Sequence, residues 1–193
     1  MIRTLSSKVA KWLEQEGNIS PKDRELFSYA IYSFLFGLLP IFIVTLLGLA
    51  FGMLWEGMLM ITPFMLIRKF SGGYHLNSSI LCVVLSIALL ALAMGFIKLI
   101  DQNGYIQLLT VFVLLSVVCL CTFSPVENDA RKLTDKERQL FRIIACILAV
   151  IVVSVYLIMY ATISVRYTAA FGMGILLAAI LQILGVVGIR ESM

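Results

Sequence analysis

The only histidine of the chain, His75, stands seven residues before a cysteine, Cys82, in a polar stretch between two long apolar runs. A thiol performs acyl chemistry when a nearby base converts it to the thiolate, and imidazole is the usual base. The same imidazole then gives the proton to the leaving group. These residue types therefore indicate nucleophilic catalysis by Cys82 with His75 as its base.

The backbone between the two residues decides whether their side chains can meet. A separation of seven residues on a continuous helix is a rise of about 10.5 Å, which is too long for a hydrogen bond. Gly72 and Gly73 favour a turn before the histidine, and the Asn-Ser-Ser sequence at 77–79 offers N-cap residues for a following helix. We therefore expect His75 in a loop over the entrance of a helix, with Cys82 about one turn inside that helix.

Spacing alone leaves a second interpretation open, in which a loop histidine and a membrane-helix cysteine share no role. Arg68 and Lys69, which precede the glycines, would then only set membrane topology and contact lipid headgroups. The choice depends on the elements that hold these residues.

Those elements belong to a membrane protein. Of the 193 residues, 61% are hydrophobic and only 13% are charged, and the mean hydropathy is +1.03. A soluble domain of this length has too little interior to bury that much apolar surface. The composition predicts one all-α domain over residues 1–193, built as a polytopic helical bundle in a membrane.

Six apolar segments reach the length of about 17–25 residues that a helix needs to cross the hydrocarbon layer. The second segment is the weakest, because it contains Glu56 and because Pro63 is expected to bend it. A tilted or re-entrant helix is the alternative there. The six segments span residues 27–50, 52–68, 79–99, 105–124, 141–162 and 167–188.

Residues 1–17 have the pattern of an amphipathic helix that lies in the membrane interface. One face of this helix is apolar and lies away from the basic residues; it consists of Ile2, Leu5, Val9, Trp12 and Leu13. A terminal helix packed on the rest of the protein is the alternative. The segment lacks the uninterrupted apolar core of a cleavable signal sequence, so we expect none here.

The basic residues orient the bundle. When both termini are placed in the cytoplasm, thirteen of the fifteen lysines and arginines fall on that side, and only Lys98 and Arg166 lie outside. The catalytic stretch (residues 68–82) and a basic loop (residues 125–142) then both face the cytoplasm. Thr134 and Glu137 form a capping-box pattern shortly before the fifth segment.

No cofactor is expected from the sequence. Cys119, Cys121 and Cys146 stand in apolar runs, where cysteine usually serves as a small buried hydrophobic residue. With one histidine in the chain, a zinc site is not expected, and a glycine-rich phosphate loop is absent. Nucleic acid is likewise not an expected partner.

The catalytic stretch, with Arg68, Gly72-Gly73, His75 and Cys82 in that order, resembles the signature of the AgrB family. These are the accessory gene regulator B membrane endopeptidases of Gram-positive bacteria. The Ser-Pro-Val-Glu-Asn segment at 124–128 resembles that family's cytoplasmic loop. Length, amphipathic N-terminus and six-span layout agree over nearly the whole chain.

The resemblance implies a multi-pass cysteine endopeptidase of the bacterial cell membrane that acts in quorum sensing. Family members remove the acidic C-terminal tail of an AgrD-like propeptide. They leave the new carboxyl group joined to an internal thiol or hydroxyl, as a thiolactone or lactone. Carried onto this sequence, Cys82 is the nucleophile and His75 the base, and Arg68 and Gly73 occupy positions that the family needs.

The remaining roles are supporting ones. The basic residues of the 125–142 loop, together with Arg68 and Lys69, would hold the acidic tail near the nucleophile. Backbone N–H groups near Gly72 and Gly73 would stabilise the oxyanion. No third catalytic member is assigned, and four polar residues remain as candidates for orienting the imidazole. The supporting residues are Lys69, Gly72, Arg131 and Lys132, and the candidate orienting residues are Asn77, Ser78, Glu127 and Asn128.

Other functions remain open at this point. Glu56 and Arg166 are intramembrane charges of the kind that a transporter or channel needs. A non-catalytic signalling factor would need neither His75 nor Cys82, and a membrane acyltransferase would use Cys82 without shortening its substrate. Small residues such as Gly172 would suit helix packing or a homodimer.

Overall fold

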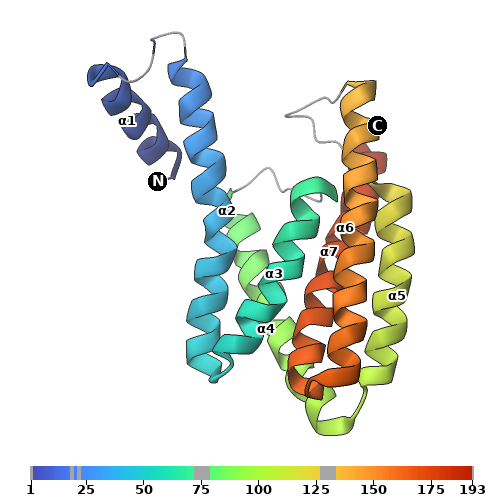
Figure 1. Cartoon of the computed structure of the whole chain (residues 1–193). Coiled ribbons are helices and arrows are strands. Elements are labelled where there is room, and N and C mark those ends of the chain that lie inside the picture. The colour runs from blue at the N-terminus through green and yellow to red at the C-terminus, as the bar shows by residue number, and fades with distance from the viewer. Residues whose placement is uncertain (1, 18–19, 21–22, 72–78, 127–133, 193) are drawn as a thin grey trace. The chain divides into compact units, whose positions relative to one another are not determined.

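The computed structural model describes residues 2–17, 20, 23–71, 79–126 and 134–192. This part of the chain is helical and contains no strand, which confirms the predicted all-α class. Its helices in chain order are α1 (Ile2–Gln15), α2 (Arg24–Phe51), α3 (Leu54–Ser71), α4 (Ser79–Asn103), α5 (Ile106–Phe123), α6 (Asp135–Thr162) and α7 (Val165–Ser192) (Figure 1).

Helices stand at all six positions where the sequence predicts a membrane segment. Within the described residues, α2, α4, α5, α6 and α7 are long and apolar enough to cross a membrane. Helix α3 has only 18 residues, and three of them are charged, Glu56, Arg68 and Lys69. A complete crossing by the second segment therefore stays a prediction.

The chain divides into two compact units, Met1–Ile43 and Val44–Met193, and each is described by itself. In the first unit, Arg24 of α2 pairs with Glu14 of α1 at 3.4 Å. The buried residues of α1 are small, Ser6 and Ala10, whereas the Trp12 side chain is 56% exposed. An exposed apolar face on α1 fits the predicted interfacial helix better than a helix packed on protein.

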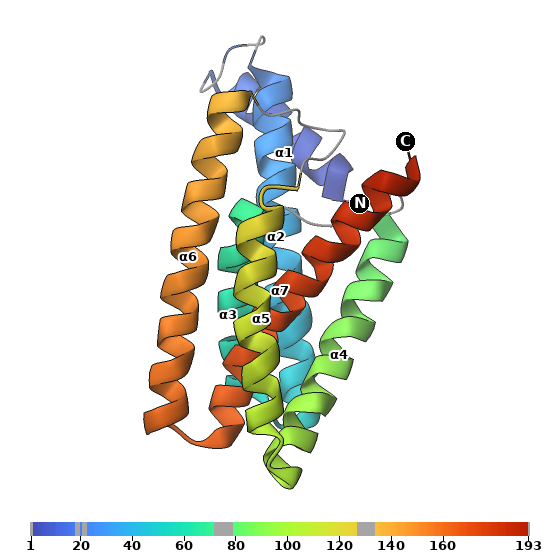
Figure 2. The same cartoon turned by 90° about the vertical axis from the view of Figure 1, so that its right-hand side faces the viewer.

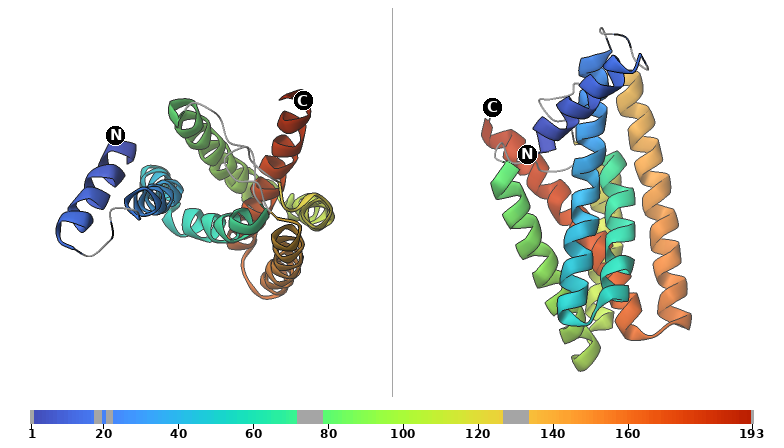
Figure 3. Two further views of the ribbon diagram at one scale, coloured as in Figure 1. Left: turned by 90° about the horizontal axis from the view of Figure 1, so that it is seen from above. Right: turned by 90° about the vertical axis from the view of Figure 1, so that its left-hand side faces the viewer.

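Helix α7 is the central element of the second unit. It packs against α3, α4, α5 and α6, and its most extensive contact is with α3. Figures 2 and 3 show α7 crossing the bundle obliquely. In its apolar part 61% of the residues are buried, compared with 18–33% in the other four candidate spans. The last helix in the chain therefore provides the core.

Small side chains let α7 approach its neighbours closely. A Cβ atom at Gly172 would lie 2.7 Å from the Tyr156 ring of α6. A Cβ atom at Gly174 would overlap the carbonyl oxygen of Met60, and it would lie 2.8 Å from the Pro63 ring of α3. Close packing of this kind drives helix association in membranes, where apolar burial between helices contributes little.

Three tight connections lie at one end of the second unit, at the bottom of Figure 1. The α2–α3 turn uses Gly52 at φ 66° and the α4–α5 turn uses Gly104 at φ 71°, a left-handed conformation that glycine adopts without strain. Ile163 and Ser164 form the α6–α7 turn, where the Thr168 hydroxyl donates to the Met159 carbonyl at 3.1 Å. The chain ends of α3, α5 and α6 that border residues 72–78 and 127–133 lie at the opposite end.

The capping box at Thr134 forms as predicted. The Thr134 hydroxyl accepts from the Glu137 N–H, and the Glu137 carboxylate accepts from the Thr134 N–H at 3.0 Å. Helix α6 therefore begins at Asp135, six residues before the predicted membrane segment. The predicted basic loop, residues 125–142, is therefore too long, because residues 135–142 form the first two turns of α6.

Candidate active site

Part of the predicted site lies within the described residues. Arg68 and Lys69 are in the last turn of α3, and Cys82 is in the first turn of α4, where only its backbone is described. The other predicted site residues, namely His75, Gly72, Gly73, Arg131 and Lys132, lie outside the described residues, as do the four candidate orienting residues.

The start of α4 agrees with its predicted N-cap. The helix begins at Ser79, directly after the polar residues that favour a helix start, and Cys82 is its fourth residue. A thiol in the first turn lies near the positive end of the helix dipole, which favours a thiolate modestly. The predicted position of Cys82, about one turn inside a helix, is therefore confirmed, and its role as nucleophile stays a prediction.

The two basic residues of α3 have different surroundings. Arg68 is half-buried, and its guanidinium carbon lies 5.6 Å from the centre of the Phe64 ring. Lys69 is exposed, with its Nζ 5.7 Å from the centre of the Phe70 ring. Phe70 in turn packs on Phe141 of α6, with 6.3 Å between ring centres. The end of α3 is thereby fixed to the basic start of α6.

Two hydrogen bonds connect the end of α3 to α7 through the segment that follows α5. The Val126 N–H donates to the carbonyl oxygen of Ser71 at 2.9 Å. Two residues earlier, the Ser124 hydroxyl accepts from Nε2 of Gln182 at 2.9 Å. Ser71, Ser124 and Gln182 are all buried, with 0%, 6% and 0% of their surface exposed.

Sequence reasoning missed Gln182. It is an amide in the middle of an apolar run, and a polar side chain at membrane depth is a functional candidate by default. That signal was present in the sequence. Its partner Ser124 was noticed only as part of a family-like segment, because a pairing over 58 residues is not readable from local pattern.

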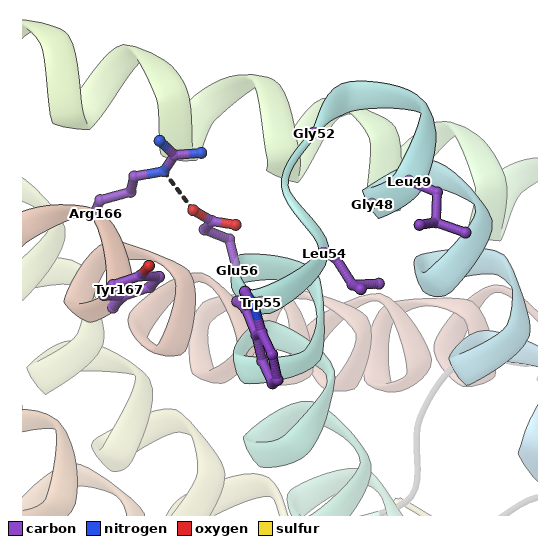
Figure 4. A pocket seen from close by; sticks show the side chains of 8 residues that line it. All are labelled: Gly48, Leu49, Gly52, Leu54, Trp55, Glu56, Arg166 and Tyr167. Carbon is purple, nitrogen blue, oxygen red and sulfur yellow. Dashed lines mark ion pairs between the residues drawn. The ribbon is translucent and has the colours of Figure 1, made fainter.

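An ion pair and a pocket lie at the other end of the unit. Glu56 in the first turn of α3 pairs with Arg166 at the start of α7 (Figure 4). The Glu56 side chain is 5% exposed and that of Arg166 is 43% exposed. They line an open pocket of about 370 Å³ together with Trp55 and Tyr167. The two charges that a transporter would need thus pair with each other.

Cys119, Cys121 and Cys146 are free thiols and are partly rather than completely buried. The Cys146 thiol lies 3.9 Å from the carbonyl oxygen of Cys121, at the contact between α5 and α6. Among the described residues, no group of three His, Cys, Asp or Glu side chains is placed to hold a metal ion.

Comparison with known proteins adds independent information. The family model of accessory gene regulator B, AgrB, matches residues 6–186. Two curated relatives from Clostridium perfringens are "Putative AgrB-like protein 2" of strain 13 / Type A, 31% identical over 97 residues, and "Putative AgrB-like protein" of strain SM101 / Type A, 30% identical over 97 residues.

Each of these alignments covers 50% of this chain and 45% of the relative, so the matched part spans about half the length of these relatives. No solved structure matches the chain. The family model, in contrast, covers nearly all of the sequence, including α3, the Cys82 turn and α7 up to residue 186. With its apolar helices, the chain is a multi-pass membrane protein that belongs to the AgrB family.

Proposed function

We propose that this protein is a membrane cysteine endopeptidase that cuts the acidic tail from the precursor of an autoinducing peptide and supports its cyclisation. The observation that carries the proposal is that the family match includes the whole catalytic stretch, with Cys82 in the first turn of α4. A thiol at a helix entrance, seven residues after the only histidine, is suited to acyl transfer.

The reaction has two acyl-transfer steps. His75 removes the thiol proton of Cys82, and the thiolate attacks the carbonyl carbon of the scissile peptide bond. The C–N bond breaks, the leaving amine takes the proton from His75, and a thioester on Cys82 remains. A thiol or hydroxyl of the precursor then attacks the thioester, which closes the ring and returns the Cys82 thiol.

The fold supports this chemistry by joining the elements around the catalytic stretch. The Phe70–Phe141 contact holds the end of α3 against the start of α6, which carries Lys136, Arg138 and Arg142. An acidic tail would be attracted to these cations with Arg131 and Lys132. The cytoplasmic orientation of this end follows from the charge distribution and is part of the proposal.

Ring closure must be faster than hydrolysis of the thioester, so water must be kept from the acyl-enzyme. Two residues at the start of the catalytic stretch are buried: Ile67, directly before it, is 2% exposed, and Ser71, within it, is 0% exposed. A precursor with an amphipathic leader would also be concentrated on the membrane surface near the site. Both features favour cyclisation of a bound peptide.

The test uses full-length protein in liposomes with a precursor peptide that has a cysteine- or serine-containing core and an acidic tail. Mass spectrometry follows tail release and any adduct on Cys82. We expect tail release by the wild type and its loss in Cys82→Ala and His75→Ala. Cys119→Ser, which alters a half-buried thiol elsewhere, serves as the matched control and should remain active.

Tail release that survives in Cys82→Ala would exclude the proposed mechanism. An acyl adduct on Cys82 of the wild type with an unshortened peptide would indicate an acyltransferase instead. Movement of an intact peptide across the vesicle membrane in both variants would support a transporter, and full signalling in both variants would support a non-catalytic factor.

A further inference from the structure

Gln182 is the most unusual polar side chain in the described part of the second unit. It lies 17 residues after the start of α7, in a helix whose surroundings are apolar, and none of its surface is exposed. Its Nε2 group donates to Ser124, but its Oε1 atom is buried without a hydrogen-bond partner. An unsatisfied buried acceptor costs about 1–3 kcal/mol, so natural structures contain few of them.

Ser124 can bond the Gln182 amide in either orientation. The oxygen and nitrogen atoms of a glutamine exchange places when the amide is flipped, and a hydroxyl such as that of Ser124 can either donate or accept. In the orientation of the structure, Nε2 is bonded to Ser124 and Oε1 is the end without a partner.

The location of this amide connects it to the catalytic stretch. Ser124 is followed by Val126, whose N–H is bonded to the last residue of α3, Ser71. Residue 72 begins the part of the chain that contains His75, and residue 127 begins the part that contains Arg131 and Lys132. Gln182 is thus bonded to Ser124, two residues before Val126, and Val126 is in turn bonded to Ser71. Ser71 and Val126 are the residues directly before the two predicted functional segments.

We propose that Gln182 is a substrate-positioning residue, whose unpaired amide end hydrogen-bonds the main chain of the peptide precursor while its other end holds Ser124. A peptide main chain provides both N–H and C=O groups, so it satisfies the free end in either orientation. This inference rests on the proposed function, because it gives Gln182 a role at the same site.

A purely structural role accounts for less of the geometry. A glutamine kept only to join α7 to the segment after α5 would bond Ser124 and direct its other end to a protein group. Ser116 illustrates such a structural contact, since its buried hydroxyl donates to the Phe112 carbonyl of its own helix at 2.8 Å. Gln182 instead retains hydrogen-bonding capacity, and its partner Ser124 lies two residues before Val126, which is bonded to Ser71.

The first measurement is binding, made on the full-length Cys82→Ala protein so that no turnover occurs. Gln182→Met preserves length and removes both hydrogen-bonding groups, Ser124→Ala removes only the Ser124 partner, and Ser116→Ala is the matched control. Loss of one buried hydrogen bond corresponds to about a tenfold change in Kd for the precursor. We expect this weakening in Gln182→Met and a smaller one in Ser124→Ala, with Ser116→Ala unchanged.

The second measurement is turnover in proteins that retain Cys82, with the ratio of cyclic to linear product as the readout. Gln182→Met should raise KM about tenfold and increase the linear, hydrolysed fraction, because a poorly held peptide closes its ring more slowly. Gln182→Glu, which keeps an acceptor of the same shape, should recover part of both values. A loss of fold alone would change the amount of folded protein without changing this ratio.

Unchanged precursor affinity and unchanged product ratio in Gln182→Met would overturn the proposal, as would equal effects of Gln182→Met and Ser124→Ala. The proposed function fails separately. If wild-type protein releases no tail while Gln182→Met still weakens precursor binding, Gln182 positions a peptide in a protein that is not a peptidase.

Discussion

Glu56 and Arg166 form an ion pair that joins the first turn of α3 to the first turn of α7. The pair stands at one end of the α3–α7 contact, and the Ser71–Val126 and Ser124–Gln182 hydrogen bonds stand at the other. The two helices that form the most extensive contact of the unit are thus connected by polar interactions at both ends.

The ion pair gives the first prediction. Arg166→Gln leaves the Glu56 carboxylate buried without its cation, and we expect a loss of about 2 kcal/mol in unfolding free energy. The double variant Glu56→Gln/Arg166→Gln should lose less, because no uncompensated charge remains. Unfolding in detergent micelles measures both values. Equal stability of Arg166→Gln and wild type would show that the pair contributes nothing.

A second prediction concerns the close approach of α7 to α3. Gly174→Ala places a methyl group against the Met60 carbonyl and the Pro63 ring, so the helices must separate. We expect a loss of about 3 kcal/mol or failure to fold. Gly95→Ala in α4 is the control, because a Cβ there meets nothing within 4 Å. It should be neutral or stabilise the protein by up to about 1 kcal/mol. A stable Gly174→Ala protein would contradict the described packing.

The third prediction tests electrostatic attraction of the acidic tail. Charge reversal in Arg131→Glu/Lys132→Glu should raise KM about tenfold at low salt, and the effect should diminish near 1 M salt, where the screening length is about 3 Å. Lys98→Glu, an exposed charge at the opposite end of the bundle, is the control. A KM increase that persists at high salt, or that Lys98→Glu reproduces, would argue against tail binding by the basic loop.

The fourth prediction concerns the direction of the reaction. Conversion of an amide to a thioester is unfavourable, and the sequence carries no glycine-rich phosphate loop that would bind a nucleotide. Thiolactone formation should therefore stop short of completion when the tail fragment is retained in a closed vesicle. A protease that degrades only the free tail should drive it forward. Complete conversion with the tail retained would contradict a reversible acyl transfer.

Local pattern predicted the helices well, since each depends on residues close together in the chain. The predicted segment 105–124 agrees with α5, Ile106–Phe123, to within one residue at each end, because polar residues lie on both sides of a predominantly apolar run. The predicted basic loop, residues 125–142, extended too far into α6. The amphipathic turn from Asp135 to Arg142 is polar enough to resemble a loop, although the capping box at Thr134 marked the correct boundary.

The long-range pairs were not predictable in the same way. Glu56 and Arg166 were recognised as unusual charges but not as partners, because their proximity depends on how α7 crosses α3. The Ser124–Gln182 bond has the same origin. Cys82 was proposed as the nucleophile from residue type, spacing and a family resemblance, whereas the Ser124–Gln182 and Glu56–Arg166 pairs appear only when the helices are packed.

The position of Arg166 in the chain has a consequence for biosynthesis. Glu56 is synthesised 110 residues before its partner, which at about 5–20 residues per second is a delay of about 5–20 seconds. During this time water or another part of the chain must solvate the Glu56 side chain. The ion pair that joins the starts of α3 and α7 can therefore form only after the first turn of α7 has been synthesised.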